Sequence, residues 1–165
     1  MKRIAHILVL AALVSACGIY SFTGTSIQAD VNTITIPYVE YKALRVNPAL
    51  SSELTDALQD KFRKLTRLEQ VDMDGDLELV CEITGYDVKA TAVTADEQAS
   101  QNRLTVTVKV EFTNREYPED DVSKSFSAYE DFDATMSLDA VEGTLCETII
   151  DKLVEDIFNA TVAQW

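Results

Sequence analysis

The residue with the clearest chemistry in the sequence is Cys17, which ends an apolar run. Residues 4–16 are mostly apolar and follow a basic start, Lys2-Arg3. A helix of this length would rise about 20 Å, which is short of a bilayer core of about 30 Å. A basic start, a short apolar stretch and small residues at its end are typical of a secretory signal peptide. Val14-Ser15-Ala16-Cys17 also matches the bacterial lipobox, in which the cysteine thiol receives a diacylglycerol before cleavage. We therefore expect a lipoprotein signal peptide over residues 1–16 and lipidation of Cys17.

A lipidated Cys17 would anchor the mature chain to a membrane. Each buried CH₂ group of an acyl chain contributes about 0.8 kcal/mol, and more than one chain makes the anchor stable. Gly18 stands where an aspartate often holds bacterial lipoproteins at the inner membrane, so the sequence favours the outer membrane. Residues 18–24 contain no acid of the kind that marks surface-exported lipoproteins in some bacteria. We expect a tether over residues 17–30 and a domain on the periplasmic side.

Side chains that catalyse reactions do not form a recognisable set in the mature chain. The one histidine, His6, falls in the predicted signal peptide, so serine and cysteine nucleophiles lack a histidine base. The sequence has 5 glycines and no glycine-rich phosphate loop. Carboxylates are frequent in residues 116–121 and 129–133, but no spacing marks the cleft that paired-carboxylate chemistry needs. We expect no catalytic residues and no cofactor.

Metal binding and disulfide formation are the other chemistries to consider. Asp72 to Asp76 resembles half of a calcium loop, but Ile83 stands where the bidentate glutamate is needed, so this segment is interpreted as a turn. We expect no metal site. Cys81 and Cys146 fall on apolar faces of predicted elements, and both buried free thiols and a disulfide remain open, because the periplasm permits disulfides.

The charge of the chain excludes one class of partner. The full sequence has a net charge of −14; removing residues 1–16 takes away two bases and no acid, which leaves 12 bases, 28 acids and a net charge of −16. Nucleic-acid binding depends on a basic surface. We therefore expect no nucleic-acid partner and no electrostatic hold on an anionic membrane.

Hydrophobic periodicity predicts the elements of one domain. Strands are expected over 33–38, 77–84, 104–112 and 122–129, with a bulge at Gly85, a loop over 91–101 and a turn over 114–121. A first helix begins at Asn47-Pro48, with Asn47 as N-cap, and places an apolar stripe along one side as far as Leu65. A second helix spans 138–164. The order β-α-β-β-β-α predicts an α+β fold with two helices packed on one face of a roughly four-stranded sheet.

The face of that sheet away from the helices is expected to be polar and rich in threonine. It is either a plain solvated face or a docking face for a partner. Its candidate partner-binding residues are Thr84, Thr105, Thr107 and Lys109.

Several segments together resemble the LptE family of lipopolysaccharide-assembly lipoproteins in its Bacteroidota form. They are the lipobox with CGIYSFTGTSI, then TITIPY, VNPALSSELTDALQDKF, GDLELVCEITGYDV, SQNRLTVTVKVEFTN, FSAYEDFD and LVEDIFNATVAQW. The resemblance covers nearly all of the mature chain, and the order of the motifs carries it. It implies a single LptE-like α+β domain over residues 31–165.

The resemblance also implies a partner, the outer-membrane β-barrel LptD, which the protein would plug and help to assemble during lipopolysaccharide transport. Some members of the family bind lipopolysaccharide through bases. The clustered bases of this chain are Lys61, Arg63, Lys64 and Arg67. These four residues either bind lipopolysaccharide or serve the helix dipole and solubility. The alternative functions are a periplasmic lipid-binding or transporter-accessory lipoprotein with its own pocket, and an enzyme that uses the acidic loops.

Overall fold

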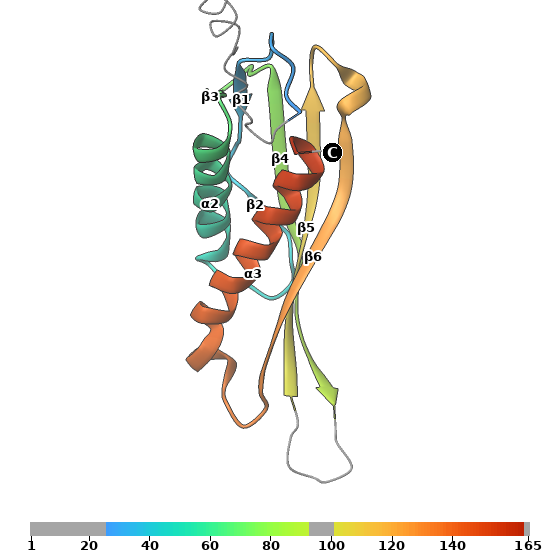
Figure 1. Cartoon of the computed structure of the whole chain (residues 1–165). Helices are drawn as coiled ribbons and strands as arrows, with labels where there is room; N and C mark the ends of the chain where they lie inside the picture. The colour runs from blue at the N-terminus through green and yellow to red at the C-terminus, as the bar shows by residue number, and fades with distance from the viewer. Residues whose placement is uncertain (1–25, 93–100, 164–165) are drawn as a thin grey trace, which may run out of the picture.

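The computed structural model describes residues 26–92 and 101–163. The predicted signal peptide, Cys17 and the tether up to residue 25 lie outside these ranges, so these predictions stay predictions. In the described part, two helices, α2 (Leu50–Leu65) and α3 (Leu138–Thr161), lie on one face of a six-stranded mixed sheet (Figure 1). The predicted α+β class and the packing of both helices on one face are confirmed.

Three long antiparallel strands form most of the sheet. They are β4 (Leu77–Ala92), β5 (Gln101–Asn114) and β6 (Val122–Asp133), and a short 3-10 helix, η1 (Pro118–Asp120), joins the last two. The strands run further than the prediction. The register shifts between Ile83 and Gly85, as the bulge predicted there requires, and alternation then resumes with buried Tyr86. The predicted loop over 91–101 is shorter at both ends, because β4 continues to Ala92 and β5 begins at Gln101.

The remaining strands are short and parallel to their neighbours. They are β1 (Thr33–Thr35), β2 (Glu40–Tyr41) and β3 (Glu69–Gln70). The sheet order is β3-β1-β4-β5-β6, and β2 pairs with β4. The prediction of about four strands therefore missed two strands, β2 and β3. Each has two residues, which is too short to show a periodic pattern. The first strand ends at Thr35 rather than at residue 38.

Both helices end close to their predicted bounds. The predicted N-cap position was wrong, because α2 begins at Leu50 with Ala49 as N-cap. Asn47 still serves the helix start, since its Oδ1 accepts hydrogen bonds from the backbone N–H groups of Ala49 (3.0 Å) and Leu50 (3.3 Å). Helix α3 ends at Thr161, three residues before the predicted end. No helix in the described ranges is long and apolar enough to cross a membrane.

The core lies between the helices and the inner face of the sheet. Leu54, Leu58 and Phe62 of α2 are fully buried, as the predicted stripe requires. Leu65 was also predicted on this stripe but is 46% exposed, because it is the last residue of the helix. The rings of Phe62 and Phe158 meet edge to face with centroids 5.2 Å apart, which joins α2 to α3.

The segment predicted as a turn, Asp72 to Asp76, fixes the parallel strand β1 beside β4. The Asp76 carboxylate accepts hydrogen bonds from the N–H groups of Asn32 (2.8 Å) and Thr33 (3.0 Å). The hydroxyls of Thr33 and Thr35 in turn accept from the N–H groups of Asp76 (2.8 Å) and Gly75 (3.0 Å). These four hydrogen bonds therefore fix the position of β1, a strand of only three residues.

Replacing Gly75 by alanine should destabilise the fold. A Cβ at this position would lie 2.7 Å from the Thr35 nitrogen and 2.9 Å from the Ile34 carbonyl carbon, both backbone atoms that cannot move aside alone. We expect Gly75→Ala to lower the free energy of unfolding by about 2 kcal/mol or more. The matched control is Gly143→Ala in α3, where a Cβ meets nothing within 4 Å. It should raise stability by about 0.5–1 kcal/mol. Urea titration of both variants measures the difference, and equal effects would contradict the argument.

The Asp76 carboxylate should make stability depend on acid pH. The hydrogen bonds from Asn32 and Thr33 hold the pKa of Asp76 below its usual range. A lowered folded-state pKa contributes stability that is present above the unfolded pKa of about 3.9 and is lost as the pH falls through the folded value. We expect Asp76→Asn to cost about 1 kcal/mol at pH 7, and the gap from the parent protein should close as the pH falls below about 4. Chemical denaturation from pH 7 to pH 3 measures this gap. Asp72→Asn, an exposed change in the same turn, is the control, and a gap independent of pH would refute the role of the charge.

Candidate functional site

The four residues predicted to bind a partner lie together on the outer face of the sheet. Thr107 on β5 stands opposite Gly85 on β4 and Ser127 on β6, and its neighbour on the same face, Lys109, stands opposite Glu82. Thr105 is the next outward residue along β5, and Thr84 lies beside the bulge on β4. The structure therefore brings Thr84, Thr105, Thr107 and Lys109 into one surface over β4 and β5.

Short hydroxyl side chains line the centre of this outer face. The hydroxyls of Thr107 and Ser127 are 2.9 Å apart, and the Thr84 hydroxyl donates to the Thr107 carbonyl at 3.4 Å. A Cβ on Gly85 would lie 3.1 Å from the Thr107 Cβ, so a side chain there would press against Thr107. The arrangement offers many hydrogen-bonding groups to a binding partner.

Sequence reasoning missed the part of this face that β6 contributes. Ser123, Ser125 and Ser127 are exposed and alternate with the inward-facing residues of the strand. They extend the hydroxyl surface to the edge of the sheet, because Ser125 pairs with Lys109 and Ser127 with Thr107. The alternation of serine with buried Phe126 and Ala128 was the signal that could have identified them.

At one end of the outer face, an arginine–aspartate ion pair lies against an aromatic ring. Arg103 Nε and Nη2 donate to the two oxygens of Asp131 at 2.7 and 2.9 Å, and the guanidinium lies 3.7 Å from the centroid of the Tyr129 ring. The Arg103 hydrogen bonds hold the pKa of Asp131 below its usual range. The two hydrogen bonds fix the Arg103 guanidinium. The guanidinium in turn holds the ring of Tyr129, which is 49% exposed, on this surface.

Two bases near the centre of the face form ion pairs. The Lys42 ammonium contacts Glu82 and, at 3.1 Å, Glu40, and the hydrogen bond from Lys42 lowers the pKa of Glu82. Lys109, one of the predicted partner-binding residues, pairs with Glu111 at 2.7 Å on its own strand. Because these bases already have acidic partners, the hydroxyl groups dominate what the centre of the face presents.

The predicted basic cluster divides into two pairs with different roles. Lys61 pairs with Glu155 on α3 and lies 5.5 Å from the centroid of the Phe158 ring, while Arg67 donates to backbone carbonyls of Gln28 and, at 3.1 Å, Val31. These two bases join α2 and the following turn to other segments. Arg63 and Lys64 are exposed and share one acid of their own helix, Asp60. Arg67 is exposed as well, and Arg63 also donates to Gln70 of β3 at 3.1 Å, so Arg63 and Lys64 differ from the other two in that their ion pairs lie within α2.

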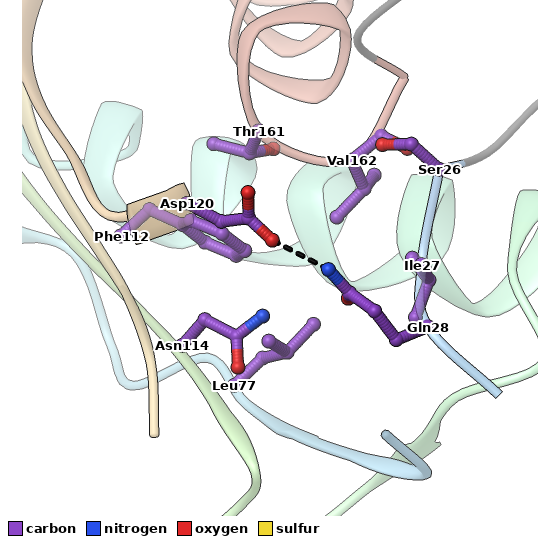
Figure 2. Close-up of a pocket in the computed structure, with 9 residues that line it drawn as sticks. All are labelled: Ser26, Ile27, Gln28, Leu77, Phe112, Asn114, Asp120, Thr161 and Val162. Atoms are coloured by element: carbon purple, nitrogen blue, oxygen red, sulfur yellow. Dashed lines mark hydrogen bonds between the residues drawn. The ribbon is translucent and has the colours of Figure 1, made fainter. Parts of the chain in front are cut away.

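A small cavity lies where the first described residues meet the C-terminal end of α3. Figure 2 shows Gln28 and Asp120 reaching toward each other across it, with Gln28 Nε2 donating to Asp120 Oδ2 at 2.6 Å. Leu77, Phe112 and Val162 form part of its wall. Its volume of about 30 Å³ has room for a water molecule and not for an acyl chain.

A larger hollow lies beside an exposed apolar loop. Tyr38, Leu44 and Val46 are 61%, 104% and 72% exposed, and Tyr38 and Val46 border a hollow of about 580 Å³. The loop is held in place because the Tyr41 hydroxyl donates to the Arg45 carbonyl at 2.6 Å. Apolar side chains on a fixed, exposed loop are typical of contact surfaces.

The two cysteines of the domain are free and buried, which confirms the thiol alternative over the disulfide. Burial raises the pKa of Cys81 to about 12, so its thiol is unreactive in the fold. Cys146 lies in a polar cluster with Asn47 Nδ2 at 3.6 Å and the Tyr86 hydroxyl at 3.9 Å. Across the described ranges, no group of three or more histidine, cysteine, aspartate and glutamate side chains is arranged to hold a metal ion.

Comparison with known proteins gives one family and a set of similar folds. A family model described as LptE, lipopolysaccharide-assembly, matches residues 31–161. No curated protein sequence matches the chain.

Among solved structures, the hypothetical protein CT253 from Chlamydia trachomatis is similar with a TM-score of 0.54 at 8% identity, covering 81% of this chain and 99% of that one. A minor lipoprotein from Acinetobacter baumannii has a TM-score of 0.49 at 14% identity, covering 77% of this chain and 89% of that one. At these identities the similarity concerns the fold alone.

Proposed function

The chain belongs to the LptE family of lipopolysaccharide-assembly lipoproteins, and we propose that it plugs and helps to assemble an LptD-type β-barrel in the outer membrane. In this role it assists the transport of lipopolysaccharide to the outer leaflet and catalyses no reaction. The observation that carries the proposal is the family match, which spans residues 31–161 and so covers nearly all of the described domain.

The outer face of the sheet suits the inside of a barrel. Barrel lumens are lined by polar side chains, and a surface of threonine and serine hydroxyls can exchange hydrogen bonds with them without burying an unpaired charge. On this face Lys42 and Lys109 already have acidic partners. We assign the partner contact to Thr84, Thr105, Thr107 and Lys109 together with the serines of β6.

The lipid anchor would hold the plug at the membrane surface. In the proposal, residues 1–16 are removed, Cys17 is acylated and residues 17–30 connect it to the domain. The backbone N–H of Ser26 donates to the Val162 carbonyl at 2.8 Å, so the chain enters the domain next to the end of α3. The anchored end of the domain is therefore the end that carries β1 and the C-terminus (Figure 1).

A lipid-binding lipoprotein with its own pocket is the second candidate, and one observation bears on it. The hollow beside Tyr38 and Val46 has the volume of a small-molecule site, about 580 Å³. It lies beside an exposed loop, lined by residues 38–42 and 46–48 and by Ser51. This placement favours a contact surface over a lipid pocket.

Changing the centre of the outer face should weaken binding to the barrel. We expect Thr107→Arg to lower the amount of LptD-type barrel that co-purifies with the acylated protein by about tenfold or more, because a long charged side chain at the centre of a close interface costs more than about 1.4 kcal/mol. Affinity purification from the native outer membrane in mild detergent, with mass spectrometry, measures the yield.

The matched control for this variant is Thr148→Arg, which makes the same change at an exposed position on α3. It should leave the barrel yield unchanged. If the parent protein brings down no barrel, the proposed partner is wrong. If the barrel yield of the two variants is equal, the partner stands and its contact lies elsewhere than on the outer face.

Arg63 and Lys64, the two bases of the cluster whose ion pairs lie within α2, should carry any direct binding of lipopolysaccharide. We expect the double variant Arg63→Glu/Lys64→Glu to reduce lipopolysaccharide capture by about thirtyfold, because each base near an anionic lipid surface contributes about 1 kcal/mol. Lys61 and Arg67 are left in place, since they join structural elements. The control, Arg45→Glu/Lys89→Glu, makes the same change in net charge at other exposed sites. Equal losses in both would mean that net charge, not this site, governs capture.

A further inference from the structure

The hollow beside the exposed loop is lined in part by a buried hydroxyl group that has no partner. Ser51 borders this hollow and is 4% exposed. Among the side-chain oxygen and nitrogen atoms of the described residues, its Oγ is the one that is buried without a hydrogen-bond partner. A buried donor left unpaired costs free energy, so nearly all such groups in folded proteins are satisfied. A ligand in the hollow that brings an acceptor oxygen would satisfy this one.

The start of α2 adds a second donor at the same residue. The N–H groups in the first turn of a helix have no acceptor inside the helix. Asn47 Oδ1 accepts from two of the N–H groups at this end, those of Ala49 and Leu50. The N–H of Ser51, the next residue, has no such acceptor within the described ranges. Ser51 therefore has two free donors, its N–H and its hydroxyl, beside the hollow.

The rest of the lining is largely apolar and is held in place. Val39 is fully buried, whereas Tyr38 and Val46 are mostly exposed at the border of the hollow. The Tyr41 hydroxyl fixes the loop, because it accepts from the Asn47 N–H at 3.1 Å and donates to the carbonyl of the loop. A preformed hollow with apolar walls and a few polar groups is the usual form of a binding site. This hollow suits an apolar group that carries an acceptor oxygen.

The charges around the hollow favour a neutral acceptor. Lys42 is the base among the lining residues, and it already pairs with Glu40 and Glu82. The first turn of α2 adds a further acid, Glu53. A carboxylate in the hollow would therefore meet like charges and no unpaired base of the lining. The oxygen that accepts from Ser51 is expected to be a carbonyl or a hydroxyl oxygen.

The hollow adjoins the outer face of the sheet. Lys42, which lines the hollow, pairs with Glu82 of β4, and Glu82 stands opposite Lys109 of β5 in the ladder. Lys109 is one of the residues assigned to the partner contact. The hollow also lies at the start of α2, which is away from the C-terminal end of α3 (Figure 1). It is therefore continuous with the face assigned to the barrel, and it lies away from the anchored end.

We propose that the hollow receives an apolar side chain from a loop of the barrel partner, and that a neutral oxygen of this loop accepts a hydrogen bond from Ser51. The inference rests on the proposed function and adds a second contact with the same partner. A loop is the source because the lumen side of a barrel wall is polar and its backbone groups are all paired within the wall. One plug in one barrel can make both contacts, since the hollow and the outer face use different residues.

Removing the Ser51 hydroxyl separates a binding role from a structural one. We expect Ser51→Ala to lower the amount of barrel that co-purifies with the acylated protein about fivefold, because one hydrogen bond across the contact is lost. The same change should not lower the urea midpoint of the protein without its partner, since this hydroxyl has no partner in the fold and alanine favours a helix. The control is Ser52→Ala, whose hydroxyl is exposed and donates to the Ala49 carbonyl at 2.8 Å. It should leave the barrel yield unchanged.

A charge at the border of the hollow tests its apolar wall. Val46→Asp should lower the barrel yield about tenfold, because a carboxylate in an apolar contact loses its hydration. Met73→Asp is the matched control, since Met73 is also an exposed apolar residue, at 78% against 72% for Val46, and lies in the turn over residues 72–76. It should leave the yield unchanged. Urea titration of both variants checks that neither change acts through the stability of the domain.

Photochemical cross-linking identifies the occupant directly. With Val46 replaced by p-benzoylphenylalanine in the acylated full-length protein in its own outer membrane, we expect a covalent adduct with the barrel, mapped by mass spectrometry to one of its loops. An adduct with a lipid, with a second copy of the chain or with the barrel wall would overturn the inference, and so would the absence of any adduct.

Failure of this inference differs from failure of the proposed function. If the parent protein brings down no barrel, the proposed function is wrong and the occupant named for the hollow is wrong with it. If the parent, Ser51→Ala and Val46→Asp bring down equal amounts of barrel, the proposed function stands and the hollow is not part of the contact. A lower urea midpoint for Ser51→Ala would assign the hydroxyl to the fold and not to the partner.

Discussion

The two-residue period of the three long strands is the constraint on which the rest of the structure depends. Because side chains alternate between the faces, a register that buries Leu79 and Val108 under the helices necessarily turns Thr107 and its neighbours outward. The bulge before Gly85 preserves this division, since it lets Ile83 and Tyr86 both point inward although they are three residues apart. Core and candidate binding face are therefore two consequences of one register.

The elements that the sequence predicted are those with enough length to show a period. The stripe along α2, from Leu50 to Phe62, and the alternation of β5 each span several repeats, and both were located within a few residues. The short strands escaped because Glu40–Tyr41 and Glu69–Gln70 are too brief for any pattern. Their placement depends on hydrogen bonds that join distant segments, such as those from the N–H groups of Glu69 to the Asn32 carbonyl and of Lys42 to the Ile83 carbonyl. Residue spacing along the chain does not encode such pairing.

The candidate site was predictable as a surface but not as a set of interactions. Alternation in β5 identifies Thr105, Thr107 and Lys109 as outward-facing, whereas the serines of β6 join them only once the register between these strands is known. Likewise, the four clustered bases are adjacent in sequence, yet Lys61 is drawn to Glu155, 94 residues away. Bases that lie close together in the sequence thus have different partners in the fold, and their spacing along the chain does not reveal those partners.

The kind of contact that the outer face could make follows from how a β-barrel is closed. A closed barrel has no free strand edge, because every strand in its wall is paired on both sides. Its lumen therefore offers side chains, which the hydroxyl groups around Thr107 can meet, but no backbone ladder for β6.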